Sequence, residues 1–375
     1  MIPYILLMFV PLLFSVIAFS SSVKENGSKW SLTAGNTQKV RDHNLMLPIF
    51  FLILIVLLSL RDVSIGNDTI TYRKFFLAYE NVSFSQMLQP QNEYLFWFLM
   101  WLVTRITNSY QIFLTIVAII TVLPIAILYS KDRRGGFLKI ALFINMSTFV
   151  MLFSGLRQAI AISIGILAYE FVREKRLFPF LITALIAVGF HTSAFMVFLL
   201  YPLYHITFKK KHLWFVIPGI LLVYVFNGPL FLWGGALLEK MFGDQYNLTL
   251  TNTGAYTMLI LFALFAVMAY VLPDEKKMSQ ETLGMRNYLL AAVVLQCFAP
   301  LHTLSMRMNY YFIIFIPELI PRLLMIPKSS MNKVAKTAII VLTVFFTLYY
   351  LYNTYRSCQT GISVLHTYPY VPFWK

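Results

Sequence analysis

Arginine residues near apolar stretches are the first candidates for a chemical role in this sequence. Arg157 lies in the segment SGLRQAIA, and Arg307 lies in SMRMNYY between two further apolar runs. A guanidinium stays charged in a low dielectric, and its planar set of donors matches phosphate or carboxylate oxygens. Two arginines at matching depth on different helices could therefore bind one anion. Each could instead reach the lipid headgroups or pair with a structural acid.

Three acid or base side chains are candidates for proton transfer or substrate orientation. His191 lies in GFHTSAF between two apolar runs, and histidine titrates near neutral pH. Asp68 lies in RDVSIGNDTITY, which starts at Arg61 and whose glycine, asparagine and aspartate favour a turn over a plain helix. Glu93 precedes the apolar segment 94–103. The alternatives are a hydrogen-bonded helix end for His191, a solvated turn for Asp68 and a helix-dipole partner for Glu93.

The sequence lacks the motifs of metal, nucleotide and redox enzymes. It contains no HExxH, no GxxxxGK[ST] and no GxGxxG after a strand, and its two cysteines, Cys297 and Cys358, support neither a disulfide framework nor a zinc site. We therefore expect no metal and no cofactor. The net charge of +15 comes without a basic face interleaved with aromatic residues, so no nucleic-acid partner is expected.

The composition points to a membrane protein. Of the 375 residues, 59% are hydrophobic and 12% are charged, whereas a soluble protein has roughly 45 to 50% apolar and about 25% charged residues. An α-helix needs about 20 apolar residues to cross a bilayer. Twelve runs approach that length: 2–19, 45–60, 110–129, 137–153, 156–172, 177–190, 192–206, 213–232, 255–272, 287–304, 308–325 and 334–352.

The sequence thus predicts an all-α, polytopic integral membrane protein with about twelve transmembrane helices in a single transmembrane domain over 1–375. The segment 94–103 is too short to cross and is interpreted as re-entrant or interfacial. Met1 to Phe19 could also be a cleaved signal peptide, but no Lys or Arg precedes Lys24, which favours a retained segment.

Charge counts assign the two sides of this topology. One side receives 21 of the 30 Lys and Arg residues, which identifies it as cytoplasmic. Both termini then face outward, and the main outer stretches are 61–109 and 233–254. All six candidate site residues fall on the outer side, where six arginines accompany only three lysines.

Five segments, taken in this order, resemble the EpsG-like branch of the Wzy-type polysaccharide polymerases. They are RDVSIGNDTITY from Arg61, NEYLF from Asn92, GLRQAIA from Gly155, FHTSA from Phe190 and RMNYYF from Arg307. A closing YPY at 368–370 fits as well, and the resemblance covers most of the chain. It implies a bacterial inner-membrane enzyme that joins undecaprenyl-pyrophosphate-linked oligosaccharide repeat units into O-antigen, capsule or exopolysaccharide on the periplasmic face, without a metal or nucleotide.

This chemistry suggests a role for each candidate residue. The donor pyrophosphate is expected to be held by three arginines, Arg157, Arg307 and Arg61. We expect His191 to be the base, with Asp68 as its rival, and Glu93 to orient acceptor hydroxyls. The expected partners are the lipid-linked oligosaccharide, membrane lipids, and a flippase and a chain-length regulator of the same pathway. Two alternatives stay open: a transporter or flippase for an anionic lipid-linked oligosaccharide, and an O-antigen ligase.

Overall fold

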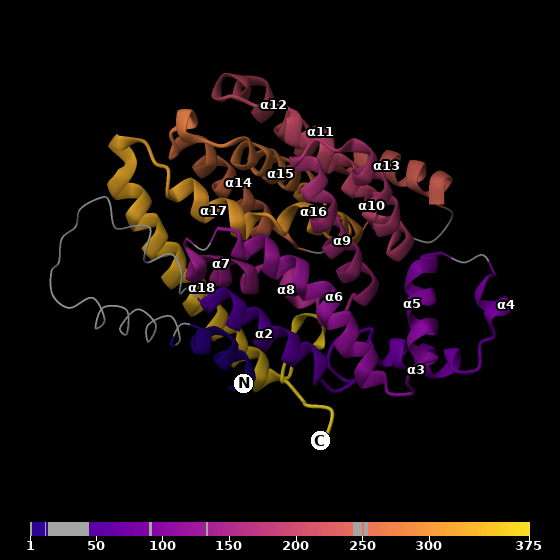
Figure 1. The fold of residues 1–375 in the computed structure, drawn as a ribbon. Helices are drawn as coiled ribbons and strands as arrows, with labels where there is room; N and C mark the ends of the chain where they lie inside the picture. The colour runs from indigo at the N-terminus through magenta and orange to yellow at the C-terminus, as the bar shows by residue number, and fades with distance from the viewer. Residues whose placement is uncertain are drawn as a thin grey trace. The chain divides into compact units, whose positions relative to one another are not determined.

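The protein is built from helices. The structure, a computed structural model, describes residues 2–11, 13, 45–89, 92–132, 134–242, 250 and 254–375. Every regular element in these residues is a helix, and extended pairing there is limited to two isolated bridges, Arg61 with Pro372 and Pro273 with Pro327 (Figure 1). A helix satisfies its own backbone groups, which apolar surroundings demand. The all-α prediction is confirmed.

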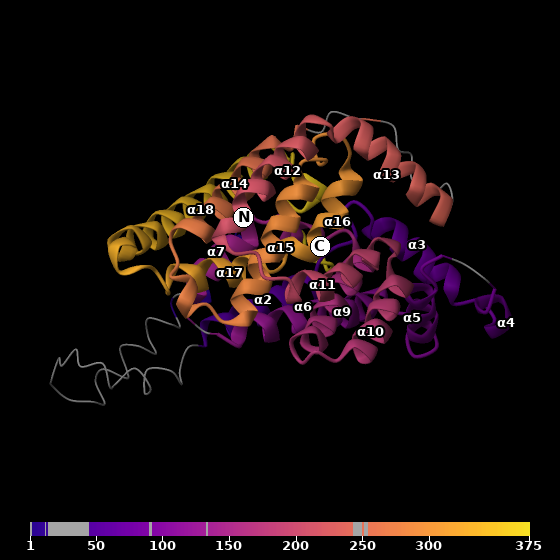
Figure 2. The same cartoon turned by 90° about the horizontal axis from the view of Figure 1, so that it is seen from above.

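The chain divides into two compact units, each assembled from segments far apart in the sequence. The first unit comprises Met1–Leu167, Ile186–Thr192 and Ile339–Lys375, and the second comprises Ala168–Leu185 and Ser193–Ala338. Three α-helices contribute residues to both units: α9 (Leu156–Arg173), α10 (Leu177–Phe190) and α18 (Asn332–Thr360). The helices can be followed from a second direction in Figure 2. The single domain over 1–375 stays a prediction.

In the first unit, an aromatic core joins three helices. After the N-terminal helix Ile2–Pro11, the helices that precede α9 are α2 (Met46–Ser59), α3 (Thr69–Tyr79), α4 (Phe84–Met87), α5 (Tyr94–Thr104), α6 (Tyr110–Ser130), α7 (Gly136–Asn145) and α8 (Ser147–Met151). Phe51 of α2, Tyr129 of α6 and Phe143 of α7 are buried, with ring centroids 5.7 to 5.9 Å apart. The helices α3 and α4 both pack against α5, and a buried cluster joins α3 and α5 to α6 and α9.

In the second unit, α15 is the central helix. The elements of this unit are η2 (Thr192–Leu199), α11 (Leu200–His205), η3 (Lys210–His212), α12 (Leu213–Val225), α13 (Asn227–Phe242), α14 (Tyr256–Val271), η4 (Glu275–Lys277), α15 (Gln280–Gln296), α16 (Thr303–Ile313), α17 (Ile316–Leu324) and η5 (Ser329–Met331). Helices α11, α12, α14, α16 and α17 all pack on α15. Gly284 permits the contact with α11, because a Cβ there would lie 2.2 Å from the ring of Tyr204.

The predicted count of twelve spans is not confirmed. Among the described residues, two helices are long and apolar enough to cross a membrane, Tyr110–Ser130 and Ser329–Thr360. A third span is possible if Lys210–Val225 and Asn227–Leu237, bent by 80° at their junction, are counted as one. Several other apolar helices are shorter, such as Tyr256–Val271. The helix α5 has 11 residues, or about 16 Å at 1.5 Å per residue, so it is too short to cross, as predicted.

The number of spans differs from the prediction because the apolar runs of the sequence do not begin and end where the helices do. The run 137–153 is divided between α7 and α8 at Met146, whose backbone is extended (φ −85°, ψ 146°). The run 192–206 begins as a 3-10 helix over Thr192–Leu199 before α11. Hydropathy measures the side chains and does not detect such breaks.

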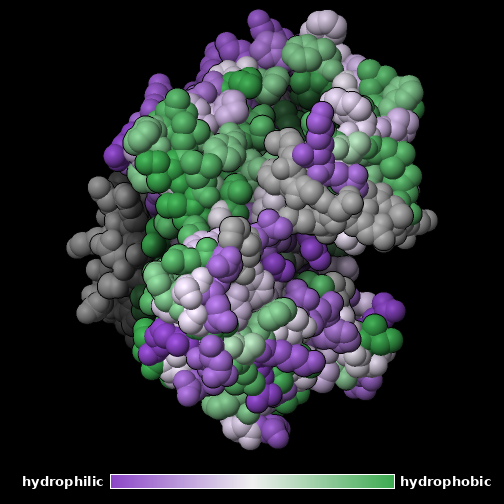
Figure 3. Space-filling model, turned by 90° about the vertical axis from the view of Figure 1, so that its right-hand side faces the viewer, coloured by the Kyte–Doolittle hydropathy of each residue, from purple (hydrophilic) through white to green (hydrophobic). Residues whose placement is uncertain are grey.

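Apolar side chains cover much of the surface, as expected of a protein surrounded by lipid. Leu123 of α6 is 49% exposed, and Val344 and Leu348 of α18 are 51% and 60% exposed. Broad apolar areas are also visible on the face drawn in Figure 3. The structure is therefore a helical, membrane-compatible one, in keeping with the composition.

Candidate active site

The candidate site lies in the first unit, at the start of the short helix α5. Glu93 immediately precedes this helix and has a left-handed backbone, with φ of 57°. That conformation is uncommon for a residue other than glycine, and such strain concentrates at functional sites. Glu93 does not cap its own helix with its side chain. Its carboxylate is instead available to residues far away in the sequence.

Both carboxylate oxygens of Glu93 are bound by groups from α9 and from the junction between α10 and η2. Arg157 donates from Nη1 to Oε2, and His191 shares a hydrogen bond between Nδ1 and Oε1. The backbone N–H and the hydroxyl of Thr192 also donate to Oε1, at 3.1 and 3.3 Å. The Glu93 side chain is 6% exposed. Three of the predicted site residues therefore converge on one another.

The guanidinium of Arg157 contacts protein groups on several sides, and one of its edges remains available. Its Nε donates to the hydroxyl of Tyr72 at 3.1 Å. Its guanidinium carbon lies 5.9 Å from the ring centroid of Tyr72 and 5.6 Å from that of Trp97, close enough for cation–π attraction. The side chain is 34% exposed, and Nη2 makes no hydrogen bond to the described residues. A fixed guanidinium with a free edge can receive an anion.

The charges around Glu93 determine its ionisation. Burial opposes ionisation, but the hydrogen bond and charge of His191, together with the charge of Arg157, lower the pKa of Glu93 to about 2. Glu93 is therefore a carboxylate near neutral pH. In the neutral form of His191, the bond to the Glu93 carboxylate places the ring proton on Nδ1 and leaves the lone pair of Nε2 available. Nε2 makes no hydrogen bond to any residue that the structure describes.

The segment that starts at Arg61 positions Tyr72. As predicted, it turns before it becomes helical, and α3 begins only at Thr69. Gly66 has φ of +93°, and a Cβ there would lie 1.9 Å from the carbonyl oxygen of Phe153. Tyr110 fixes the start of α3 by donating from its hydroxyl to the carbonyl of Thr69 at 3.0 Å.

The other three predicted residues lie in different surroundings. Arg61 is 2% exposed; its Nη1 donates to the carbonyl of Leu58 at 2.8 Å, and its guanidinium lies 5.8 Å from the ring centroid of Phe153. Asp68 is exposed at the N-terminus of α3. Arg307 is an exposed residue of α16 in the second unit, so its convergence with Arg157 stays a prediction.

Sequence reasoning missed two contributors to this cluster. Trp97 is one of several aromatic residues in the apolar segment 94–103, and Thr192 directly follows His191 in the sequence. The density of aromatic residues in 94–103 and the hydroxyl beside the histidine are the signals that could have identified them.

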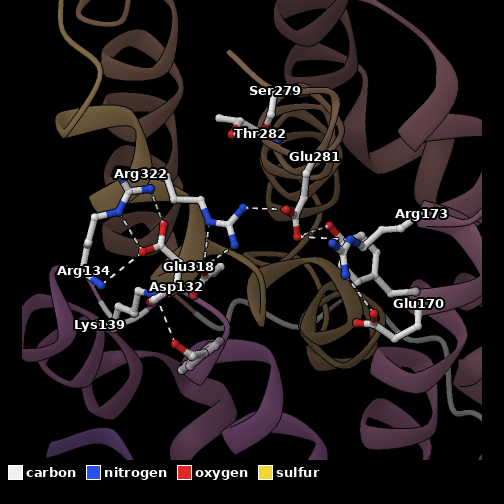
Figure 4. A network of polar contacts seen from close by, with 12 residues as sticks. Asp132, Arg134, Lys139, Glu170, Arg173, Ser279, Glu281, Thr282, Glu318 and Arg322 are labelled. Carbon is white, nitrogen blue, oxygen red and sulfur yellow. Dashed lines mark hydrogen bonds and ion pairs between the residues drawn. The ribbon is translucent and has the colours of Figure 1, made fainter. Parts of the chain in front are cut away.

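A second group of charged residues, part of the network drawn in Figure 4, lies within the second unit. Arg322 lies between Glu318 and Glu281, at 2.7 and 2.8 Å, and Arg173 lies between Glu281 and Glu170, at 3.3 and 2.8 Å. Each arginine is thus paired with two carboxylates. This pairing is typical of a structural network, whereas Arg157 shares a single carboxylate with His191.

Metal ligation is not an evident role of these clusters. Within the described residues, no group of three His, Cys, Asp or Glu side chains could hold a metal ion. Independence from metal and cofactor stays a prediction.

Comparison with known proteins gives one match. No curated protein and no solved structure matches this chain. A family model described as the EpsG family matches residues 44–371, which include every residue of the cluster around Glu93. Because this match covers most of its length, the chain belongs to the EpsG family.

Proposed function

We propose that this protein is a polysaccharide polymerase that joins undecaprenyl-pyrophosphate-linked oligosaccharide repeat units into a surface polysaccharide. Its family comprises Wzy-like polysaccharide polymerases, which supports the general role. The observation that carries the proposal is the triad of Arg157, Glu93 and His191, in which an anion-binding group and a base share one carboxylate. We further propose that the reaction takes place on the periplasmic face of the bacterial inner membrane.

The reaction transfers a glycosyl group from pyrophosphate to a hydroxyl. The acceptor hydroxyl oxygen attacks the anomeric carbon of the donor while Nε2 of His191 takes the hydroxyl proton. The bond from the anomeric carbon to the pyrophosphate oxygen breaks, and its electron pair leaves with the pyrophosphate. The free edge of Arg157 offsets the charge that develops there. Such a donor is typically worth about 3 kcal/mol of transition-state stabilisation.

Glu93 acts in this proposal as a positioning residue. Both of its oxygens are used within the protein, by Arg157 on one side and by His191 and Thr192 on the other. We therefore assign it the orientation of His191 and Arg157, in place of the predicted contact with acceptor hydroxyls. The burial of Arg61 suggests a structural role for that residue, and Arg307 is kept as a proposed second contact to pyrophosphate.

A transporter or flippase is the alternative from another class. Such proteins commonly carry broken helices in corresponding positions of two repeats. Among the described helices, the junction of α12 and α13 is one strongly bent pair. A single bend does not form such a pair of repeats, so the polymerase is preferred.

Deletion of the gene, followed by electrophoresis of the surface polysaccharide, tests the function. Loss of a polymerase should leave single repeat units on the acceptor and abolish the ladder of long chains. Loss of a flippase or an O-antigen ligase should abolish both. An unchanged ladder, or loss of the single units as well, would contradict the polymerase proposal.

A further inference from the structure

The helix α5 has two faces of different chemistry. Phe96, Met100 and Val103 are spaced by three or four residues and are buried, with exposures of 0%, 0% and 3%. The opposite face carries four aromatic residues at the same helical spacing: Tyr94, Trp97, Phe98 and Trp101. All four are partly exposed. We call this second face the aromatic stripe.

The rings of the aromatic stripe are ordered by one another. Tyr94 and Phe98 are stacked with centroids 6.1 Å apart and an interplanar angle of 14°, and Phe98 and Trp101 are stacked at 6.0 Å and 21°. Tyr79 of α3 stacks on Trp97 at 5.7 Å and 17°. Rings held in this way form one ordered apolar surface that can bind a ligand without a further loss of side-chain freedom.

Membrane anchoring is the simplest alternative explanation, because Trp and Tyr are enriched at bilayer interfaces. There the polar tip of the ring faces water or headgroups. In the aromatic stripe, both indole N–H groups are bonded within the protein. Trp97 donates to the carbonyl of Asn92 at 3.1 Å, and Trp101 donates to that of Val82 at 2.9 Å. Because both indole N–H groups are bonded within the protein, the exposed parts of Trp97 and Trp101 are apolar ring atoms.

The aromatic stripe is continuous with the candidate active site. Trp97 contacts the guanidinium of Arg157. From Tyr94 to Trp101 the stripe extends for about 10 Å along the helix axis, at 1.5 Å per residue. A donor whose pyrophosphate lies at Arg157 has its first sugar bonded directly to that pyrophosphate, so its next sugars lie within reach of these rings.

We propose that the aromatic stripe binds the sugar rings of the donor oligosaccharide, an inference that rests on the polymerase function proposed above. A pyranose presents hydroxyls at its edge and C–H groups on its face. The C–H groups are weakly positive and complement the negative face of an aromatic ring. The exposed surfaces of these rings thus hold the sugars, while Arg157 holds the pyrophosphate.

The test replaces rings by leucine, which keeps the apolar volume and the helix propensity but removes the flat π-surface. The variant is Tyr94→Leu with Phe98→Leu. A matched control is Phe345→Leu with Tyr349→Leu on α18, another exposed pair in the first unit, stacked at 5.9 Å and 9°. Isothermal titration calorimetry of the full-length protein in detergent uses two probes. One is the free oligosaccharide that mild acid releases from the lipid-linked repeat units, and the other is inorganic pyrophosphate.

We expect the α5 variant to bind the free oligosaccharide roughly tenfold more weakly and the α18 control to bind it normally. Both should bind pyrophosphate like the wild type, which shows that they are folded. Phe98→Leu alone, the milder change, should weaken oligosaccharide binding about threefold.

Unchanged oligosaccharide binding by the α5 variants, as membrane anchoring predicts, overturns the proposal. An equal loss in the α18 control, or no binding of the oligosaccharide to the wild-type protein, overturns it as well. A wild-type protein that binds the oligosaccharide but not pyrophosphate contradicts the role of Arg157 and leaves the aromatic stripe supported. Failure of the polymerase function itself is recognised separately, by the gene deletion.

Discussion

Glu93 connects the two kinds of chemistry that the sequence suggested separately. Arg157 and His191 were expected to bind an anion and to take a proton, and both bond the same carboxylate. By sharing it, they acquire a fixed spacing and fixed orientations. The carboxylate also leaves one edge of each partner unused: Nη2 of Arg157 and Nε2 of His191. These two edges are the groups that a glycosyl transfer from pyrophosphate needs.

The ionisation of Glu93 should make the stability of the protein depend on pH. Its pKa is about 2 in the folded protein, against 4.5 without these partners. A lowered pKa contributes stability that is present above pH 4.5 and is lost as the pH falls towards 2. Relative to the wild type, Glu93→Gln should therefore be less stable by on the order of 3 kcal/mol at pH 6. Thermal unfolding in detergent should show this difference shrinking below pH 4.5, and a constant difference would contradict the assignment.

Replacement of Arg157 by lysine tests whether anion binding depends on geometry. Lysine keeps the charge, but one ammonium cannot bond Tyr72 and Glu93 and still present a free edge. Arg157→Lys should lower polymer synthesis by about a hundredfold at normal protein level, in line with the loss of one transition-state donor. Arg73→Lys, at an exposed position of α3 in the same unit, is the control and should have no effect. Full activity of Arg157→Lys would indicate that the residue only anchors its helix.

The identity of the base is tested by a pair of variants. His191→Ala removes Nε2 and should abolish the long-chain ladder on electrophoresis while the protein level in membranes stays normal. Asp68→Asn changes an exposed carboxylate outside the triad and should leave the ladder intact. The reverse result, with a full ladder for His191→Ala and none for Asp68→Asn, would show that the carboxylate is the base.

At the scale of elements, the C-terminal tail and the segment that starts at Arg61 support each other. The backbone N–H of Gly66 bonds the carbonyl of His366 at 3.0 Å, and Asp62 bonds Val371 in the same way at 2.8 Å. Tyr370 donates from its hydroxyl to the carbonyl of Leu57 at 2.9 Å. The YPY sequence near the C-terminus thus lies beside the segment that positions Tyr72, which explains why two distant motifs occur together.

Gly66→Ala should disrupt this arrangement. A Cβ at Gly66 would lie 1.9 Å from a backbone oxygen, and φ of +93° is strained for alanine. We expect a loss of more than 1 kcal/mol in unfolding free energy, measured by thermal unfolding, together with lower activity. Gly219→Ala in α12 is the control, because nothing lies within 4 Å of its Cβ and alanine favours a helix. Equal melting temperatures for the two variants would contradict this view of Gly66.

The sequence predicts the features that depend on neighbouring residues, and it does not predict those that depend on contacts between residues far apart in the chain. The turn before α3, the shortness of α5 and the helical class depend on nearby residues, and the structure confirms them. The triad joins residues 64 and 98 positions apart, so its existence depends on packing that no local pattern encodes. The span count is not confirmed: α7 ends at Met146 and the chain bends by 80° between α12 and α13, and hydropathy detects neither.

At the scale of the whole molecule, the charge counts that assigned the two sides agree with the contacts within each unit. Arg173, Glu281 and Arg322 come from three segments predicted to be cytoplasmic, and ion pairs join them in the second unit. Glu93, Arg157 and His191 come from segments predicted to lie outside, and they meet in the first unit. The charge counts did not use the contacts among these residues, so this agreement supports the predicted sidedness.

Reporter fusions test that sidedness directly. Alkaline phosphatase is active only outside the cytoplasm, so fusions after residues 85, 190 and 306 should be active and those after 175, 211 and 278 inactive. The physical reason is the concentration of Lys and Arg on one side, for example at Lys209, Lys210 and Lys211. The fusions after 175 and 190 give the most direct comparison, because the one helix between them is α10. It has 14 residues and is about 21 Å long. Equal activity of these two fusions would mean that α10 does not cross and that His191 shares a side with Arg173, which would remove the triad from the outer face.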